Sequence, residues 1–401
     1  MDVDAEVDVA IVGAGPAGAS TALHLARFAP ALAGSTLLIE RSAHPRSKLC
    51  GGGLVNDVDV VLRNLGLDLS KVPHADASWA NLHYQGRGLR MQLGDIAFHV
   101  VRRADLDAWL ASHVRDCGIQ IRENTLVTNI ETRADGIILR TNTGTIRARA
   151  VVGADGSKGM VRRMLPGGRG SVARLVEVVT PPRPPKGLTT EDALFEFRNI
   201  PEGIQGYSWS FPMWTDGKPM RNWGVYDSRL VGAPETGSLV AYLKEELARH
   251  GLDIADYKVE GHPLRLFTPG ATLSTERIVL AGDSAGADPL LGEGISLALG
   301  YGELAAQAIV DAFSSGDFSF ADYSQSVHRS PMGRSLRRRH LAARMVYGLR
   351  SSLPQQLIWW RIKPLLRTFI RRGVFSWATP TTHKINARAR PMGPLHPARS
   401  L

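Results

Sequence analysis

The sequence predicts a mixed α/β fold that has a parallel sheet, a second, antiparallel sheet and a helical C-terminal region. An apolar run at residues 7–12 leads through a glycine-rich turn into a helical pattern over 19–28 and a second apolar run over 35–40. This order is typical of a βαβ unit with buried parallel strands. Aromatic residues recur over 186–262 in an alternation that favours antiparallel strands. The first pattern makes the N-terminal domain Rossmann-like, and the second predicts a separate domain.

Length and composition indicate a globular protein of several domains. The chain has 401 residues, of which 44% are apolar and 21% charged, and at ~100–200 residues per domain this suggests two or three domains. It contains no run of ~18 consecutive apolar residues, which disfavours a membrane-spanning helix. The acidic opening Met1–Glu6 is unlike a secretory signal, and two cysteines, Cys50 and Cys117, fit a reducing compartment. A cytoplasmic location is therefore expected.

The positive charge of the chain is concentrated at its C-terminal end. The formal net charge is +10, but no Asp or Glu follows Asp322, and residues 323–401 contain 14 Arg and 2 Lys. The preceding residues carry 32 basic and 38 acidic side chains, a net charge of −6. Nucleic acid is not expected as a partner, because the body is acidic and the proline-interrupted tail shows no recognition motif.

Further elements follow along the chain. Residues 120–152 contain β-branched runs broken by Asp135-Gly136 and Thr143-Gly144, which predicts hairpin turns. Residues 277–281 are another candidate for a buried strand, and a helix is predicted over 294–313.

The strongest motif is Gly13-Ala14-Gly15-Pro16-Ala17-Gly18, which follows the first strand and opens the first helix. Gly13 permits a tight turn, Gly15 lets the backbone approach a pyrophosphate, and Gly18 allows close helix–strand packing. The free N–H groups at the helix N-terminus suit phosphates, and Glu40, at the end of the next strand, suits ribose hydroxyls. In this context a dinucleotide-binding turn is favoured over a purely structural glycine turn.

Two further glycine-rich strings end predicted strands. Residues 152–163 contain Asp155-Gly156, and residues 280–295 contain Gly282-Asp283. Small residues let a planar cofactor lie against the backbone, and a carboxylate at such a turn can hold a chain of hydroxyl groups. Either string alone also fits an ordinary Asp-Gly turn.

Together, the three strings resemble the FAD-binding fingerprints of the para-hydroxybenzoate-hydroxylase-type flavoproteins. The resemblance implies FAD as cofactor, with Glu40 at the adenosine ribose and Asp283 near the ribityl chain and pyrophosphate. Residues 101–110 also resemble the family's Arg-x-x-Leu/Phe-Asp-x-x-Leu helix start, which makes Arg103 either a flavin contact or a capping or surface arginine. The implied FAD-binding residues are Gly13, Gly15, Ala17, Gly18, Glu40, Arg41, Cys50, Gly51, Arg103, Asp155, Gly156, Gly282, Asp283, Pro289, Gly292, Gly294 and Ile295.

Two more strings narrow the resemblance. Residues 48–54, Lys-Leu-Cys-Gly-Gly-Gly-Leu, are similar to the Cys-Gly-Gly segment of geranylgeranyl reductases. Residues 207–212, Tyr-Ser-Trp-Ser-Phe-Pro, followed by Asn222-Trp223-Gly224, look like their Tyr-x-Trp-x-Phe-Pro signature beside the substrate pocket. The resemblance implies a pocket for a large apolar or aromatic substrate that is lined by Tyr207, Trp209, Phe211 and Pro212.

Cys50 and Trp209 are the candidate catalytic residues. Cys50 is flanked by three glycines, and Lys48 is expected to lower the pKa of its thiol, which would act as a proton donor or gate over the flavin. Burial as a small hydrophobic residue is the alternative. Trp209 shares one strand face with Tyr207 and Phe211, either as a pocket wall or as core packing.

Motifs for other chemistries are few. The sequence has no phosphate loop, no His-Glu-x-x-His and no Cys-x-x-Cys. Its twelve histidines are scattered without ligand spacing, so no metal site is predicted. Because one dinucleotide fingerprint is present, NAD(P)H or another electron donor, such as a reductase or a ferredoxin, is expected to visit transiently.

The C-terminal region combines basic and apolar residues. Leu341, Met345, Leu349 and Leu353 recur at a spacing of four, and residues 357–372 interleave Trp, Leu, Ile and Phe with Arg and Lys. Such helices suit the surface of an anionic membrane, which predicts peripheral attachment to its inner face. An acidic protein partner, or packing onto the chain's own body, is the alternative.

These patterns divide the chain into three parts, with a boundary at the proline-rich connector that precedes the aromatic region. The expected parts are a discontinuous FAD-binding domain of residues 1–73, 101–180 and 263–330, a substrate domain of residues 74–100 and 181–262, and a basic helical region of residues 331–401.

The expected function is the reduction of carbon–carbon double bonds in a large apolar, prenyl substrate by hydride from reduced FAD. One alternative is a monooxygenase that hydroxylates an aromatic substrate or an aromatic side chain through a flavin C4a-hydroperoxide, with halogenation as a lesser branch. The other is a flavin-bound protein without catalytic activity.

Overall fold

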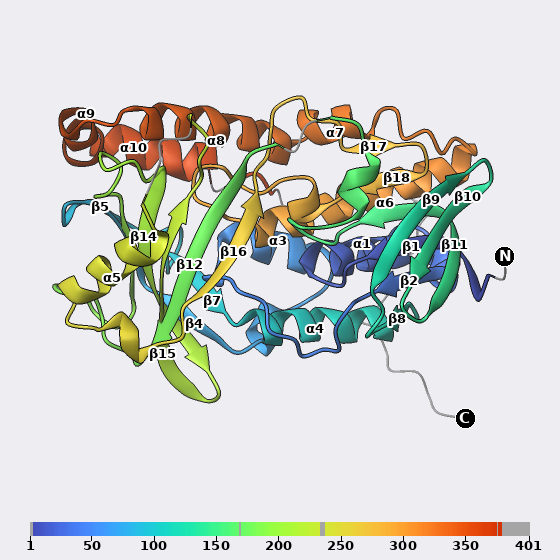
Figure 1. The fold of residues 1–401 in the computed structure, drawn as a ribbon, viewed down its shortest axis with the longest axis horizontal. Coiled ribbons are helices and arrows are strands. Elements are labelled where there is room, and N and C mark those ends of the chain that lie inside the picture. The colour runs from blue at the N-terminus through green and yellow to red at the C-terminus, as the bar shows by residue number, and fades with distance from the viewer. Residues whose placement is uncertain (1–2, 168–169, 233–236, 375, 379–401) are drawn as a thin grey trace.

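A computed structural model describes residues 3–167, 170–232, 237–374 and 376–378 of the chain. Two sheets lie side by side, and the C-terminal helices lie along one side of the second sheet (Figure 1). The mixed α/β fold with a helical C-terminal region is therefore confirmed.

The first sheet has eight strands, six of which follow the order β17-β18-β11-β1-β2-β8. Strand β1 pairs in parallel with β2 and β11, as the βαβ pattern predicts. The predicted hairpins are also present, because β9, β10 and β11 pair in antiparallel fashion across the two Gly-containing turns. The strands are β1 (Ala5–Val12), β2 (Thr36–Ile39), β8 (Gln120–Arg122), β9 (Val127–Arg133), β10 (Gly136–Thr141), β11 (Gly144–Gly153), β17 (Ser274–Thr275) and β18 (Ile278–Leu280).

Two long helices pack against each other next to this sheet: α1 (Pro16–Phe28) and α6 (Ile295–Ser315) (Figure 1). They approach closely, since Ser20 Oγ donates to the Leu299 carbonyl over 2.7 Å. Strand β1 is fully buried at Val9–Ile11, so this part of the core is continuous from sheet to helices. The other helices of this half are α2 (Pro30–Ala33), α3 (Asn56–Asn64), α4 (Arg103–Asp116) and α7 (Tyr323–Arg329).

The second sheet has seven strands in the order β16-β12-β15-β14-β13-β5-β6. All neighbours are antiparallel except β13 and β5, which pair in parallel. One face packs on α5 (Leu239–Arg249) through a cluster that includes Trp223. The strands are β5 (Trp79–Tyr84), β6 (Arg87–Met91), β12 (Val172–Thr180), β13 (Asp192–Glu196), β14 (Gly206–Thr215), β15 (Lys218–Asp227) and β16 (Glu260–Arg265).

The sheets do not divide the chain at the boundaries expected from the sequence. Strand β12 was assigned to the FAD-binding segments, but it pairs with β15 and β16 in the second sheet. A small third sheet is formed by β3 (Gly53–Leu54), β4 (His74–Ala77) and β7 (Phe98–Val101). The strands that pair with β12 lie about forty or more residues further along the chain, and a local sequence pattern does not reveal such partners.

The C-terminal region packs on the face of the second sheet that does not carry α5. Trp359 stacks on Phe197 with ring centroids 4.0 Å apart, and Trp360 Nε1 donates to the Tyr84 carbonyl over 3.0 Å. Residues 379–401 of the predicted region lie outside the described residues. The elements of the C-terminal region are α8 (Pro331–Gly348), α9 (Ser352–Gln356), a π-helical turn (Leu357–Arg361), α10 (Lys363–Phe369) and a second π-helical turn (Ile370–Val374).

Candidate functional site

The turn between β1 and α1 forms a cradle that leaves backbone N–H groups open. Gly13 has a φ of 103°, and a Cβ on it would lie 2.4 Å from the Ala154 carbonyl oxygen. A Cβ on Gly18 would lie 1.9 Å from the Gly13 carbonyl oxygen, so α1 can approach β1 only without a side chain there. Helix α1 begins at Pro16 with no side-chain cap. Its N-terminus is therefore suited to an anion.

A cavity of ≈ 350 Å³ opens at this cradle. A Cβ on Gly15 would lie 3.6 Å from guanidinium nitrogens of both Arg46 and Arg103, so these two cations face the same space. Most of the predicted FAD-binding residues line this cavity: Gly13, Gly15, Ala17, Glu40, Arg41, Cys50, Gly51, Arg103, Asp155, Gly156, Asp283, Gly292, Gly294 and Ile295.

Three predicted FAD-binding residues are not among those that line the cavity. Gly18 closes the contact between α1 and the Gly13 turn, and a Cβ on Gly282 would lie 2.7 Å from the Cβ of Ala17. The carbonyl of Pro289 accepts from the hydroxyl of Tyr226 over 3.0 Å. These three residues support the residues that line the cavity but do not line it themselves.

The carboxylates around the cavity differ in their partners. Glu40 accepts from the Ala14 N–H over 2.9 Å and pairs with Arg46 over 3.3 Å. Arg103 donates to both carboxylate oxygens of Asp107, over 2.8 and 2.9 Å. Asp283 has one long contact, 3.5 Å from Ser157 Oγ, and burial raises the pKa of its carboxyl. It therefore has capacity left for a ligand hydroxyl.

Asp155 links the second and third glycine-rich strings. It accepts from the Val161 N–H over 2.9 Å and from Ser284 Oγ over 3.0 Å. Residues 282–286 also fit the Gly-x-Ser-x-Gly pattern of hydrolase nucleophiles. Ser284 is fully buried and accepts from the Gly156 N–H, so its hydroxyl acts as a connection between the two strings.

These observations fit FAD. The helix N-terminus, Arg46 and Arg103 face one space that a diphosphate can occupy, and no side chain fills it at Gly15. Asp283 lines the same cavity. Its carboxylate can accept further hydrogen bonds, as the binding of a chain of hydroxyl groups requires.

A second, apolar cavity of ≈ 110 Å³ adjoins the first. Tyr207, Trp209 and Phe211 project into it from one face of β14, because side chains alternate along a strand. Pro212 lies at the alternate position, and it is buried but is not one of the residues that line the cavity. Six residues line both cavities: Cys50, Gly51, Leu175, Gly292, Gly294 and Ile295.

Two acids meet at this junction. The N–H of Cys50 donates to Glu177 Oε1 over 3.3 Å, and Glu177 lines the larger cavity. Burial raises the pKa of the Cys50 thiol, and burial raises the pKa of Glu177 to about 7. Lys48 was expected to lower the pKa of the Cys50 thiol, but the net shift is upward, because burial outweighs the nearby positive charges. Lys48 Nζ instead donates to His262 Nε2 over 2.8 Å, and burial lowers the pKa of both groups.

Sequence reasoning missed Glu177, Arg46 and His262. A signal for Glu177 exists in the sequence, since it is the one acid in the otherwise apolar stretch 175–179. Trp209 is close to this network, because its Nε1 donates to Asn222 Oδ1 over 2.5 Å.

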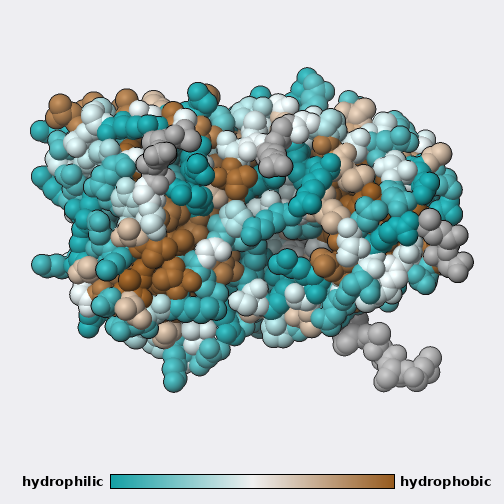
Figure 2. Space-filling view, viewed as in Figure 1, coloured by the Kyte–Doolittle hydropathy of each residue, from teal (hydrophilic) through white to brown (hydrophobic). Residues whose placement is uncertain are grey.

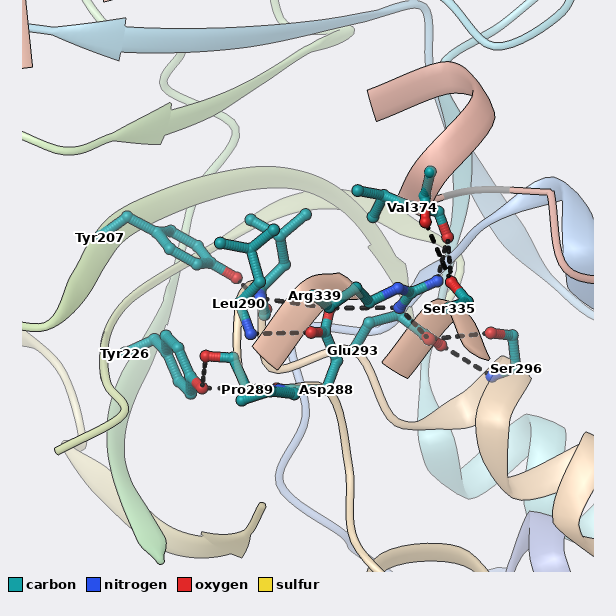
Figure 3. A network of polar contacts seen from close by, with 12 residues as sticks. Tyr207, Tyr226, Asp288, Pro289, Leu290, Glu293, Ser296, Ser335, Arg339 and Val374 are labelled. Carbon is teal, nitrogen blue, oxygen red and sulfur yellow. Dashed lines mark hydrogen bonds and ion pairs between the residues drawn. The ribbon is translucent and has the colours of Figure 1, made fainter. Parts of the chain in front are cut away.

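The loop of residues 288–293, which follows the Gly-Asp string, is held by side chains from other elements, among them β14 and α8 (Figure 3). The hydroxyls of Tyr207, on β14, and Tyr347, on α8, donate to the carbonyls of Leu291 and Leu290. Arg339 pairs with Asp288 over 3.2 Å and with Glu293 over 3.6 Å, and the Arg339 and Asp288 side chains are 0% exposed. Thus α8 is fixed to the wall of the site.

Within the described part of the chain, His74, Asp76 and His99 bring potential metal-ligand atoms within 4.8 Å of one another. The sequence did not predict this grouping, because β4 and β7 meet only in the folded chain. His99 Nδ1 donates to Asp76 Oδ1 over 2.7 Å, so a hydrogen bond accounts for the contact of this pair.

Comparison with known proteins agrees with the geometry of the site. The family described as FAD binding domain matches residues 6–300. A geranylgeranyl bacteriochlorophyll reductase-like structure from Thermoplasma acidophilum superimposes with a TM-score of 0.72 at 20% identity, covering 94% of each chain.

Two curated relatives are similar over most of the chain. A menaquinone reductase of Mycolicibacterium smegmatis is 28% identical over 336 residues, 76% of each chain. A digeranylgeranylglycerophospholipid reductase of Methanopyrus kandleri is 28% identical over 343 residues, 78% of this chain and 83% of the relative. The present chain belongs to the FAD binding domain family and is an FAD-dependent oxidoreductase.

Proposed function

We propose that this oxidoreductase reduces carbon–carbon double bonds in a prenyl substrate. The observation that carries the proposal is the apolar, aromatic-walled cavity that shares Cys50, Gly51, Leu175, Gly292, Gly294 and Ile295 with the cofactor cavity. An apolar chain in the smaller cavity would lie directly against the cofactor. The reductase names of the relatives, which refer to prenyl lipids and menaquinone, support the same substrate class.

The residues around the junction have distinct roles in this reaction. FAD, when bound and reduced, supplies a hydride equivalent to one carbon of the double bond. The phenol and indole rings of Tyr207 and Trp209 hold the apolar chain and exclude water. The other carbon needs a proton, and Cys50, whose thiol is kept protonated, is placed to deliver it. Glu177, which accepts from the backbone N–H of Cys50, lies beside that residue and would restore the proton to its thiol.

The alternatives are separated by anaerobic single-turnover experiments. Protein reduced by NAD(P)H or by a chemical donor should be reoxidised when a geranylgeranyl lipid is added without oxygen. The product should gain two hydrogens per reduced bond, measured by mass spectrometry. If reoxidation requires oxygen and an aromatic product gains an oxygen atom, the protein is a monooxygenase and the proposal is wrong.

The Glu177→Gln variant is expected to lose one limb of the pH–rate profile, the fall in the rate of reduction as the pH rises. The protonated acid is the active form, so the wild-type rate should fall as the pH rises through about 7. The variant should be slower by about 10²–10⁴-fold below that pH, as for loss of a general acid, and should lack this limb. The measurement is the multiple-turnover rate against pH with the electron donor in excess, because Glu177 acts after each proton transfer from Cys50.

Glu260→Gln is the matched control, because Glu260 lies opposite Glu177 in the pairing of β12 with β16. Its carboxylate pairs with Lys258 at the surface. This variant should keep the rate at low pH and should still show the limb, shifted toward lower pH because the Glu260 charge contributes to the raised pKa of Glu177. A Glu177→Gln enzyme with the wild-type profile would rule out Glu177 as the proton source, and Cys50→Ser would then decide whether Cys50 acts alone.

A further inference from the structure

We propose that the C-terminal helices α8–α10 form a docking face for an anionic lipid bilayer, on the side of the molecule where the apolar cavity lies. Docking itself is independent of the reaction. The delivery of a membrane-embedded substrate to that cavity rests on the proposed function.

The outward side of these helices is apolar. The most exposed large apolar side chains described in this region are Leu353, Leu365, Leu341 and Met345, at 77%, 70%, 67% and 61% exposed, and Leu349 and Leu357 extend the same strip. Leu341 and Met345 are four residues apart and so share one face of α8, and Leu349 follows at the C-terminal end of this helix. Hydrophobic residues accordingly run along the edge of the molecule that carries α8 and α9 (Figures 1 and 2). Several large apolar side chains exposed along one edge favour an interaction site there.

The same face is strongly basic. Arg337, Arg338 and Arg344 are exposed on α8, Arg367 is exposed on α10, and Arg361 is exposed in the turn before α10. No acidic residue follows Asp322 in the sequence, so no carboxylate of this region opposes them. Leucines interleaved with arginines suit a surface that is both apolar and anionic, which is the interface of a bilayer with acidic headgroups.

Packing of the chain onto its own body does not use this strip. The inward side of α8 is already occupied, because Arg339 and Tyr347 are fully buried against residues 288–293. Trp359 is buried against Phe197 on the second sheet. The C-terminal helices are therefore anchored to the body of the protein through one side, and the exposed leucines lie on the opposite side.

The strip is continuous with the wall of the apolar cavity. Ile370 lines that cavity together with Met91 and Leu93, while Leu365, five residues earlier, points outward. Leu366 packs on the same core cluster as the cavity wall. A bilayer seated on α8–α10 would therefore lie next to the cavity that we assign to the prenyl chain. In the described part of the chain no helix is long and apolar enough to cross a membrane, and an interfacial mode agrees with this.

The test is co-sedimentation of the full-length protein with vesicles. Wild type should bind vesicles of phosphatidylcholine mixed with phosphatidylglycerol, and binding should weaken at high salt and with phosphatidylcholine alone. The pair Leu341→Gln and Met345→Gln, and separately the pair Leu353→Gln and Leu365→Gln, should each reduce partitioning by about tenfold or more. Point variants are required because truncation before α8 would remove the buried Arg339.

The matched control is the pair Val179→Gln, on β12, and Val240→Gln, on α5. Both side chains are exposed, and this pair should bind vesicles like wild type. Equal binding by strip and control variants would overturn the proposal. So would a change of molecular mass in solution caused by the strip variants, which would make the strip an interface between copies.

Activity separates docking from function. Strip variants should keep the wild-type rate with a short prenyl substrate dispersed in detergent and lose rate with substrate embedded in vesicles. Vesicle binding without reduction of any prenyl substrate would contradict the proposed function alone. Reduction of vesicle-embedded substrate at equal rates by wild type and strip variants would contradict the docking proposal alone.

Discussion

Replacing Arg339 by leucine is expected to lower the free energy of unfolding by about 3–5 kcal/mol. The substitution would leave Asp288 and Glu293 buried without their cation, since Arg339 pairs with both. Breaking a buried ion pair by removal of one partner costs more than the pair itself contributes, because the remaining charge stays desolvated. Urea unfolding of the FAD-free protein, followed by tryptophan fluorescence, measures the loss.

Arg338→Leu is the control for this experiment. Arg338 is the neighbouring residue on α8 and is exposed, so the same substitution should change stability by no more than about 0.5 kcal/mol. Equal losses in the two variants would mean that the leucine, and not the lost ion pair, destabilises the helix.

The loss in Arg339→Leu should depend on pH with a defined sign. Even beside Arg339, burial raises the pKa of Glu293 to about 7, above its ordinary value of 4.5. The folded state therefore binds more protons than the unfolded state between these values, and stability falls as the pH rises through them. Without the cation this trend must steepen, so the variant should recover part of its stability at about pH 5 relative to about pH 8.

Gly15→Thr is expected to weaken FAD binding by about a hundredfold or more, which corresponds to about 2.7 kcal/mol. Gly15 has extended backbone, with φ of −81° and ψ of −172°, so its conformation does not require glycine. What requires glycine is the space beyond it, where a Cβ would point between Arg46 and Arg103. A threonine side chain would occupy the position of the diphosphate. Titration of FAD into the FAD-free protein measures the affinity.

The stability of FAD-free Gly15→Thr should stay close to that of wild type, because Thr and Gly are about equally good at the N-cap of a helix. Gly34→Thr serves as control, since nothing lies within 4 Å of a Cβ at Gly34. It should bind FAD normally. If Gly15→Thr also bound FAD normally, the cavity at α1 would not be the cofactor site.

The local sequence predicted the cofactor half of the site well. The order of β1, α1 and β2 follows from residues adjacent in the chain, and so does the placement of Glu40 at the end of β2. The alternation of Tyr207, Trp209 and Phe211 likewise predicted one strand face. Such features depend on short-range spacing, which a single sequence contains.

Features that depend on long-range packing were not predicted. Nothing near Arg339 in the sequence indicates that it is the buried partner of Asp288, among many exposed arginines of the same helix. The raised pKa of Cys50 depends on burial, and Lys48, its neighbour in sequence, turns instead to His262. Helix α5 was also missed, because the aromatic alternation around it favoured strands throughout.

The loop of residues 288–293 has a thermodynamic consequence. Gly292 lines both cavities, and the preceding Leu291 carbonyl is bound by Tyr207, which lies in the substrate wall. Cofactor and substrate would thus touch the same few atoms of backbone. Any factor by which bound FAD changes the affinity for substrate must equal the factor by which substrate changes the affinity for FAD. The order of uptake then affects the rates of assembly and leaves the stability of the final complex unchanged.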